Sequence, residues 1–514
     1  MLVAFVALYL AASMGIGLWA ATRVHGSKDY AVAGRSLPFL VVVATVFATW
    51  FGSETVLGIP AKFLEGGLAS VVEDPFGSSA CLVLVGLFFA ARLYRMDLLT
   101  IGDYFRLRFG PVVEVVVSLV IVASYLGWVS AQVVALGLVF DVVSAGAVSP
   151  PVGIVAGAAI VTLYTVFGGM FSVAWTDFAQ MVLIVLGLLY IAAVVAAEAG
   201  GVSRVIAHAE AAGRLRFLPT SSTRDVLWFA GSAVTMMFGS IPQQDVFQRV
   251  TSARTARIAS IGAVVGGVAY FFFAFVPIFL GYSASLIDPH LVATVGRTDP
   301  QQVLPRLVLG HAPVFAQVMF FGALLSAIMS TASGTLLAPS VTFTENVLRK
   351  ILPEGLTDRQ LLWTMRGVVL AFAVLVTAFA LDSDSSIYEM VGNAYKVTLV
   401  GAFVPLVAGL YWPRASTAGA LASVAAGLAT WGILELGWPR ATVPPQLAGL
   451  LAAVLAMVAG SLLSPRAPTA RRAFDGSRPT SSRSGVRGRP PRSRSRRGPS
   501  GSPRRRRPRS TDVR

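Results

Sequence analysis

The sequence is poor in cysteine, histidine and charge. Cys81 is the single cysteine in 514 residues, which excludes a disulfide within the chain. The four histidines are far apart in the sequence, and the HExxH and GxSxG patterns of zinc and serine hydrolases are missing. Charged residues make up 13% of the chain, against about 25% in soluble domains. We therefore do not expect an enzyme or a soluble domain.

Apolar residues are abundant instead. They make up 55% of the chain, and the mean hydropathy is +0.72. Apolar runs near the length that crosses a bilayer recur along the sequence. We predict an all-α polytopic membrane protein with about 13 transmembrane helices. The predicted spans are residues 2–21, 37–63, 68–91, 112–143, 152–167, 173–197, 226–247, 258–282, 312–343, 361–380, 387–410, 418–436 and 446–463.

The net charge of +16 belongs almost wholly to the C-terminal tail. Residues 464–514 hold 17 arginines and two aspartates, so the other residues carry a net charge of only +1. The tail is rich in Arg, Ser and Pro and has few apolar residues, which predicts disorder. Binding to anionic lipid headgroups and an inert solvated tail are both open interpretations. Nucleic-acid binding is not expected, because no aromatic residue is interleaved among the clustered arginines.

The loops predict an orientation in the cell (inner) membrane. No positive charge precedes the first span, whereas Arg23, Lys28 and Arg35 follow it, so we expect an uncleaved helix with its N-terminus outside. The loops then assigned to the inside hold 15 lysines and arginines, and those assigned outside hold eight. We counted Arg249 and Arg254 among the inner charges. This bias predicts a cytoplasmic C-terminus.

Two predicted spans contain helix breakers at membrane depth. The second span includes Gly52, Gly58 and Pro60, together with the carboxylate of Glu54. The seventh includes the sequence Gly239–Pro242. Broken helices at corresponding places in two halves are typical of inverted-repeat transporters, whose sites lie at the midplane. The alternative is a pair of kinked helices that pack tightly on their neighbours.

These breaks suggest a five-plus-five inverted-repeat core and a division of the chain into six parts. The parts are an extra N-terminal helix and cytoplasmic loop (1–36), a first five-helix repeat (37–197), an extracellular loop (198–224), a second repeat (225–410), two C-terminal helices (411–463) and the tail (464–514).

The ninth span carries hydroxyl groups with helical spacing. Ala327, Ser330 and Thr331 share one helical face, so two hydroxyls and a carbonyl are available together. Sodium is a small hard cation that needs about five oxygen ligands, by the logic that applies to other hard cations. Carbonyls from a broken helix could supply the rest. The alternative is that these hydroxyls bond to their own helix or to neighbouring helices.

Four motifs resemble the sodium:solute symporter family over about residues 35–440. They are YTVFGGMFSVAWTDFAQ (164–180), QQDVFQRVTSAR (243–254), AIMSTASGTLLAPSVTFTENV (327–347) and GLYWPRASTAGALAS (409–423). The resemblance implies a sodium site formed by the carbonyls of Ala48, Phe51 and Ala327 and the hydroxyls of Ser330 and Thr331. It also implies that Asp177 lies on the sodium exit path, and the alternative for Asp177 is an N-terminal helix cap.

The resemblance implies sodium-coupled import of a small organic solute by alternating access. Candidate solute-binding residues are Glu54, Trp50, Asp74, Ser240, Gln243 and Asn393. Two carboxylates near the site would suit an amino-acid-like or ammonium-containing solute, or they could pair with Lys396 as a structural ion pair. Alternative functions are a membrane sensor built on the symporter fold and a proton-coupled carrier that uses Glu54 or Asp74.

Overall fold

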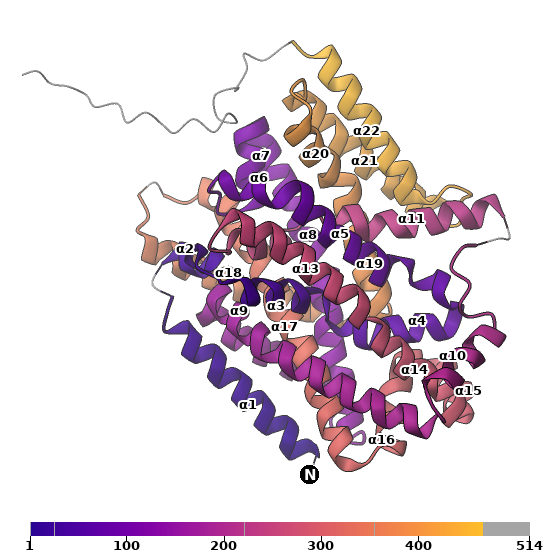
Figure 1. The fold of residues 1–514 in the computed structure, drawn as a ribbon. Helices are drawn as coiled ribbons and strands as arrows, with labels where there is room; N and C mark the ends of the chain where they lie inside the picture. The colour runs from indigo at the N-terminus through magenta and orange to yellow at the C-terminus, as the bar shows by residue number, and fades with distance from the viewer. Residues whose placement is uncertain (1, 25, 220–221, 354, 466–514) are drawn as a thin grey trace, which may run out of the picture. The chain divides into compact units, whose positions relative to one another are not determined.

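The computed structural model describes residues 2–24, 26–219, 222–353 and 355–465, and this part of the chain is helical without a β-strand (Figure 1). The longer elements are α1 (Leu2–Ala21), α2 (Ser27–Val32), α3 (Phe39–Trp50), α4 (Ile59–Gly66), α5 (Ser78–Leu84), α6 (Ala90–Arg95), α7 (Ile101–Phe109), α8 (Pro111–Val143), α9 (Pro150–Glu198), α10 (Val202–Ala211), α11 (Thr223–Gly239), α12 (Gln244–Thr251), α13 (Ala256–Phe273), α14 (Phe275–Ile287), α15 (Pro289–Thr298), α16 (Val303–His311), α17 (Val314–Asn346), α18 (Asp358–Leu381), α19 (Ile387–Thr398), α20 (Val404–Tyr411), α21 (Thr417–Gly437) and α22 (Pro445–Leu463). Short π or 3₁₀ turns are η1 (Ala33–Arg35), η2 (Glu54–Gly58), η3 (Leu68–Val71), η4 (Val72–Gly77), η5 (Val85–Phe89), η6 (Pro300–Gln302), η7 (Leu348–Lys350) and η8 (Leu399–Phe403).

The apolar helices follow the predicted spans in order. Ten helical segments of the described chain are long and apolar enough to cross a membrane, and the bent pair 39–50 and 54–66 makes eleven. The two remaining predicted spans fall on shorter elements, Pro150–Leu163 and α11. The all-helical, multi-pass prediction is confirmed, and the number 13 remains a prediction.

Both helix breaks occur where the glycines and prolines predict them. The helix 39–66 bends by 54° between Trp50 and Glu54. A second gap, residues 240–243, separates α11 from α12. Between the fifth and sixth predicted spans, Gly169 adopts φ +51° and ψ −153°, so the glycine pair makes a kink inside α9. The bounds of the two five-helix repeats remain a prediction.

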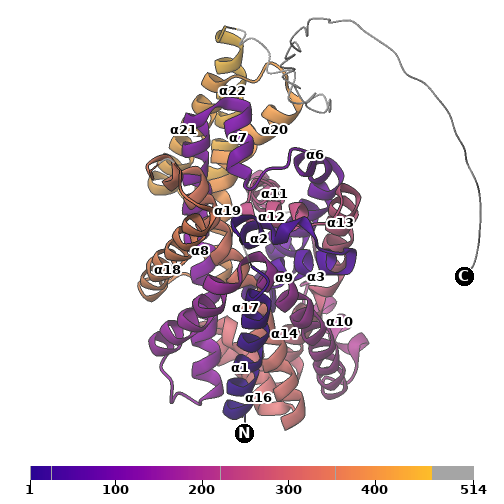
Figure 2. The same cartoon turned by 90° about the vertical axis from the view of Figure 1, so that its left-hand side faces the viewer.

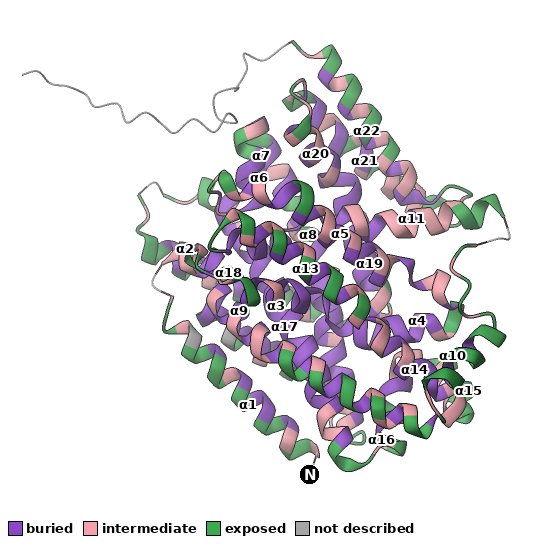
Figure 3. Ribbon diagram, viewed as in Figure 1, coloured by how far each residue is buried: buried purple, intermediate pink, exposed green. Residues whose placement is uncertain are grey.

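Helix α17 lies at the centre of the helical body. Every residue from 320 to 342 on it is buried, and it packs against α3, α8 and α9. Figure 2 shows α17 surrounded by other helices, and Figure 3 shows that buried residues concentrate there while α1 is exposed along much of its length. Side chains that α17 presents to α3 and α9 are therefore shielded from lipid.

The position of Arg249 differs from the prediction, and the disorder of the tail stays a prediction. Arg249 was counted as an inner-loop charge, but it lies in α12 and is only 1% exposed. The breaker Pro242 shortens the preceding helix, and the chain then forms a second, buried helix rather than a loop. The predicted disorder of the tail concerns residues that lie, apart from the first two, outside the described part of the chain.

Candidate functional site

The break after α3 exposes backbone groups that neighbouring helices then contact. Phe51 leaves helical geometry with φ −83° and ψ 69°. A Cβ atom added to Gly52 would lie 2.7 Å from both Oε2 of Glu54 and Oγ1 of Thr331, so only glycine fits there without a shift. The amide of Ser53 donates to Oε1 of Gln132 on α8 at 3.1 Å. A side chain thus replaces the missing helix bond, as the low-dielectric surroundings require.

Three of the predicted sodium ligands meet on the α3 side of this break, which the predicted orientation makes the inner side; we call the opposite side the outer side. The carbonyl oxygen of Ala48 accepts hydrogen bonds from Ser330 Oγ at 3.3 Å and from Thr331 Oγ1 at 3.2 Å. All three residues are fully buried. The hydroxyls therefore contact a neighbouring helix, which fits both the predicted ion site and the alternative in which hydroxyls join two helices. The arrangement gathers oxygens from two helices at one point, as a hard cation requires.

The other two predicted ligands lie close by in the chain. Phe51 is the non-helical residue of the break, and Ala327 precedes Ser330 by about one turn of α17. Both residues are fully buried. The side-chain hydroxyls of Ser330 and Thr331 reach the Ala48 carbonyl, and no side-chain hydrogen bond of theirs to Phe51 or Ala327 is present among the described residues, so the structure brings three of the five predicted ligands into contact.

Asp177 joins the same group through its carboxylate. It is fully buried and accepts hydrogen bonds from Thr45 Oγ1 and Ser330 Oγ, both at 2.5 Å. Asp177 lies inside α9, well past the kink at Gly169, so the interpretation as a helix cap is wrong. A carboxylate that touches a hydroxyl of the predicted sodium set can attract a cation to that set.

The outer side of the break holds the two predicted carboxylates. Oε2 of Glu54 accepts from Nε2 of Gln132 at 2.8 Å. Oδ1 of Asp74 accepts from the hydroxyl of Tyr270 at 2.5 Å, and the same hydroxyl lies 2.9 Å from Oγ1 of Thr55. A chain of hydrogen bonds therefore links Asp74 to the residue that follows Glu54.

The predicted alternative, an ion pair with Lys396, is not formed. Nζ of Lys396 bonds instead to Oε1 of Glu435 on α21 at 3.2 Å. Glu54 and Asp74 are both buried, and their hydrogen-bond donors are neutral side chains. The two carboxylates are thus available to a cationic partner from outside the protein.

The remaining solute candidates are less favourably placed. Ser240 donates to its own helix, at the carbonyl of Met236, at 2.6 Å. Nε2 of Gln243 bonds to Ser124 Oγ at 3.0 Å and to Thr398 Oγ1 at 3.3 Å, so its amide ties three segments together. Asn393 is exposed on α19 and lies away from this buried group, because the buried face of α19 carries Tyr395. The structure does not bring Asn393 to the site.

A buried aromatic cluster adjoins Glu54, and sequence reasoning identified only one of its members. The ring of Trp50 stacks on Tyr395 with centroids 5.5 Å apart, and Trp128 lies 5.8 Å from Trp50 and 5.2 Å from Tyr395. The indole of Trp128 lies beside the Glu54 carboxyl. Nε1 of Trp50, the hydroxyl of Tyr395 and Oε1 of Glu54 have no hydrogen-bond partner within the described chain. We call Trp50, Trp128 and Tyr395 the aromatic cluster.

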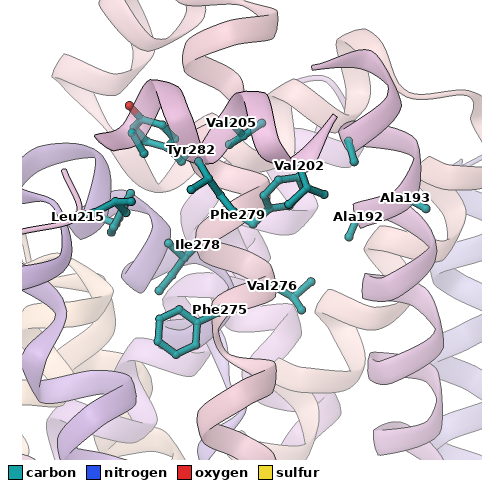
Figure 4. Close-up of a pocket in the computed structure, with 14 residues that line it drawn as sticks. Ala192, Ala193, Val202, Val205, Leu215, Phe275, Val276, Ile278, Phe279 and Tyr282 are labelled. Carbon is teal, nitrogen blue, oxygen red and sulfur yellow. The ribbon is translucent and has the colours of Figure 1, made fainter. Parts of the chain in front are cut away.

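A well-defined pocket lies elsewhere. It has a volume of about 450 Å³ and is lined mainly by apolar residues of α9, α10 and α14, with Phe63 from α4 (Figure 4). In the close-up, Phe275, Val276 and Phe279 come from one helix and Ala192 from another. None of the predicted ion or solute residues lines it. Tyr282 contributes a hydroxyl, but no carboxylate lines the pocket, so it is not the candidate site.

Comparisons with known proteins identify relatives of the chain. Residues 30–427 match the model of the sodium:solute symporter family. The chain is 28% identical over 442 residues to the human high affinity choline transporter 1, covering 83% of this chain and 75% of that protein. It is 27% identical over 489 residues to the sodium/proline symporter of Haemophilus influenzae, covering 89% and 93%. A solved structure of a sodium-coupled sialic acid symporter matches with a TM-score of 0.76 and 20% identity over 91% of this chain and 99% of that one, which shows a shared fold.

Proposed function

Since this chain belongs to the sodium:solute symporter family, we propose that it imports a small solute with a cationic nitrogen, driven by sodium. The family and its relatives are membrane transporters, so the chain is a multi-pass symporter and not an enzyme. The class of solute, a small molecule with a cationic nitrogen, is what we add to the family assignment. We further propose that the N-terminus is outside and the C-terminus is cytoplasmic, as the loop charges favour.

Sodium occupies the inner side of the break in this proposal. Its ligands are the carbonyls of Ala48, Phe51 and Ala327 and the hydroxyls of Ser330 and Thr331. The contacts of Ser330 and Thr331 with the Ala48 carbonyl support this assignment. A sodium ion would replace these weak hydroxyl–carbonyl bonds with stronger ion–oxygen contacts. Asp177, bonded to Ser330, draws the ion inward from this set.

The aromatic cluster beside Glu54 is the observation that carries the solute class. Aromatic faces attract cationic nitrogen, most strongly when water is excluded. Trp50 and Trp128 are each 1% exposed and Tyr395 is fully buried. The free oxygen of Glu54 adds the opposite charge that a buried ammonium group needs. The relatives named for choline and proline carry solutes of this chemical class.

Coupling follows from the shared helix break. Sodium on the inner side draws α3 against α17 and so fixes the position of Gly52 and Glu54. Glu54 and the aromatic cluster are then preorganised for the solute. Because coupling is reciprocal, bound solute raises sodium affinity by the same factor, commonly about 5- to 150-fold. A bundle of helices that includes the broken helix would then rock against the rest of the core and open the site inward.

The proposal can be tested with purified protein. We would measure thermal stability with choline, glycine betaine, proline, glucose and iodide, each with sodium and with potassium. A ligand at 100 times its Kd stabilises by about 2.7 kcal/mol, which a thermal shift detects. We expect stabilisation by at least one nitrogen cation, and only with sodium, followed by sodium-driven uptake of that solute in proteoliposomes. Responses restricted to glucose or iodide would contradict the solute class.

A further inference from the structure

Arg249 is a buried cation next to the proposed sodium position. It lies in α12, where every residue from 241 to 253 is buried. Nη2 of Arg249 is 3.9 Å from Oδ2 of Asp177, and no hydrogen bond is made by Nη2 within the described chain. A buried guanidinium with a free N–H group is costly, so its position calls for a functional explanation.

The rest of the guanidinium is held by the helices that carry the sodium ligands. Nε donates to Oγ1 of Thr49 on α3, and Nη1 lies 3.4 Å from the carbonyl of Asp245. A Cβ atom at Gly334 of α17 would lie 2.1 Å from Nη2, so this glycine leaves the room that the guanidinium fills. Arg249 therefore contacts α3, α9 and α17, the three helices that meet at the proposed ion.

Helix α12, which carries Arg249, is also joined to the start of α3. Leu37 N donates to the carbonyl of Ser252 at 3.0 Å, and Arg254 N donates to the carbonyl of Leu37 at 3.0 Å. The helix that carries the guanidinium is therefore fixed against the helix that carries Ala48 and Thr49.

The net charge of the buried groups around the proposed ion matches that of one monovalent cation. Asp177 and Asp245 are fully buried and Arg249 is 1% exposed. Tyr125 donates to Asp245, whose charge is thereby partly compensated. With both carboxylates ionised and Arg249 protonated, the group carries one net negative charge, which a single sodium ion neutralises.

We propose that Arg249 is a positioning residue that competes with sodium for the carboxylate of Asp177. While sodium is bound beside Ser330, the carboxylate of Asp177 is shared between sodium and Arg249. Nη2 of Arg249 then stays 3.9 Å from that carboxylate. As sodium leaves, the guanidinium closes on the carboxylate, which compensates its charge and speeds release. This inference rests on the proposed sodium position and adds a residue that acts on the ion through Asp177.

The test compares variants that change how strongly the residue at position 249 competes with sodium for Asp177. Arg249→Gln removes the competing charge, so sodium should bind at least tenfold more tightly and turnover should fall. Arg249→Lys keeps the charge and should stay within about threefold of the wild type. Thr49→Val removes the hydroxyl that holds Nε, which frees the guanidinium to close on Asp177, and should weaken sodium binding by about threefold. Thr342→Val is the matched control, because that hydroxyl bonds only to its own helix at Ala338.

The readout is the sodium midpoint of thermal stabilisation without solute, together with turnover in proteoliposomes. A merely structural Arg249 predicts the opposite sign, with weaker sodium binding in Arg249→Gln. A weaker or unchanged sodium affinity in Arg249→Gln, or a tighter or unchanged one in Thr49→Val, with a sodium-responsive wild type, would overturn this inference alone. If Arg249→Gln does not fold, the Thr49→Val midpoint decides. A wild type that ignores sodium would overturn the proposed function as well.

Discussion

The two sides of the break in the helix 39–66 differ in the chemistry they present. On the inner side, hydroxyl and carbonyl oxygens of Ala48, Ser330 and Thr331 meet within about hydrogen-bond distance. On the outer side, three aromatic rings lie 5.2–5.8 Å apart next to Glu54. Only Phe51, Gly52 and Ser53 separate the two sides.

This difference suggests how one break can serve two kinds of cation. A hard ion such as sodium prefers oxygen ligands. A large organic cation prefers aromatic faces and one carboxylate. Because the same three residues adjoin both surfaces, a movement caused by one cation changes the position of the groups that bind the other. The following variants test whether sodium binding and solute binding depend on different sides of the break. They are given from the largest to the smallest expected loss of affinity.

Gly52→Ala should impair both sides and has the largest expected effect. The new methyl group would lie 2.7 Å from groups of Glu54 and of Thr331. We expect the affinities for sodium and for solute to fall by about 100-fold each, near the upper end of the roughly 1–3 kcal/mol that such overpacking costs. Thermal shifts with each ligand alone measure this. The control is Gly367→Ala, where a new methyl group would meet open space. A variant that loses affinity for sodium alone or for solute alone would contradict the shared role of Gly52.

Ser330→Ala/Thr331→Ala should affect the inner side first. Removal of two hydroxyl ligands should weaken sodium binding by about 100-fold, since each bond to a charged group contributes about 1.5–3 kcal/mol. The sodium dependence of solute uptake reports the change. The control is Ser340→Ala/Thr342→Ala on the same helix, where both hydroxyls bond only to their own turn. An unchanged sodium dependence would show that the ion lies elsewhere.

Glu54→Gln should affect the outer side alone. It keeps the shape of the side chain and the bond to Gln132 but removes the charge, so solute affinity should fall about 30-fold, near 2 kcal/mol. Sodium binding without solute should change by less than about threefold. Glu65→Gln, an exposed residue paired with Lys62, is the control. Equal losses of sodium and solute affinity would mean that Glu54 also serves the ion.

Trp128→Phe should have the smallest effect. Phenylalanine keeps an aromatic face but attracts cations more weakly, so solute affinity should fall about fivefold, near 1 kcal/mol. We expect no change in the sodium midpoint. Trp363→Phe, on the exposed side of α18, is the control. A tighter-binding Trp128→Phe variant would argue against a cationic solute.

Much of this architecture could be predicted from the sequence because it depends on local signals. Hydropathy located the helices, and Gly52 and Pro242 marked the breaks, since glycine and proline weaken helices wherever they occur. The spacing of Ser330 and Thr331 placed both hydroxyls near one face of α17, and the motif resemblance supplied Ala48 as their partner. The structure brings these three residues into contact.

The site residues that the sequence did not predict could be found only by knowing which helices pack against each other. Trp128 and Tyr395 lie in apolar spans far apart in the sequence, and only tertiary packing brings them to Trp50. One local signal was available, because Trp128 precedes Gln132 by four residues and so shares its helical face. Arg249 falls in a predicted loop because the seventh predicted span ends at residue 247 and the next begins at residue 258. Its burial depends on Asp177 and Thr49, which the sequence alone does not place beside it.

Gln132 uses both ends of one amide at the helix break. Its oxygen accepts from the freed amide of Ser53, and its nitrogen donates to Glu54. The repair of the interrupted backbone and the anchoring of the acidic group are therefore a single arrangement. A substitution at this position cannot alter one without the other, so the unwound segment and its charge must change together in any variant of this transporter.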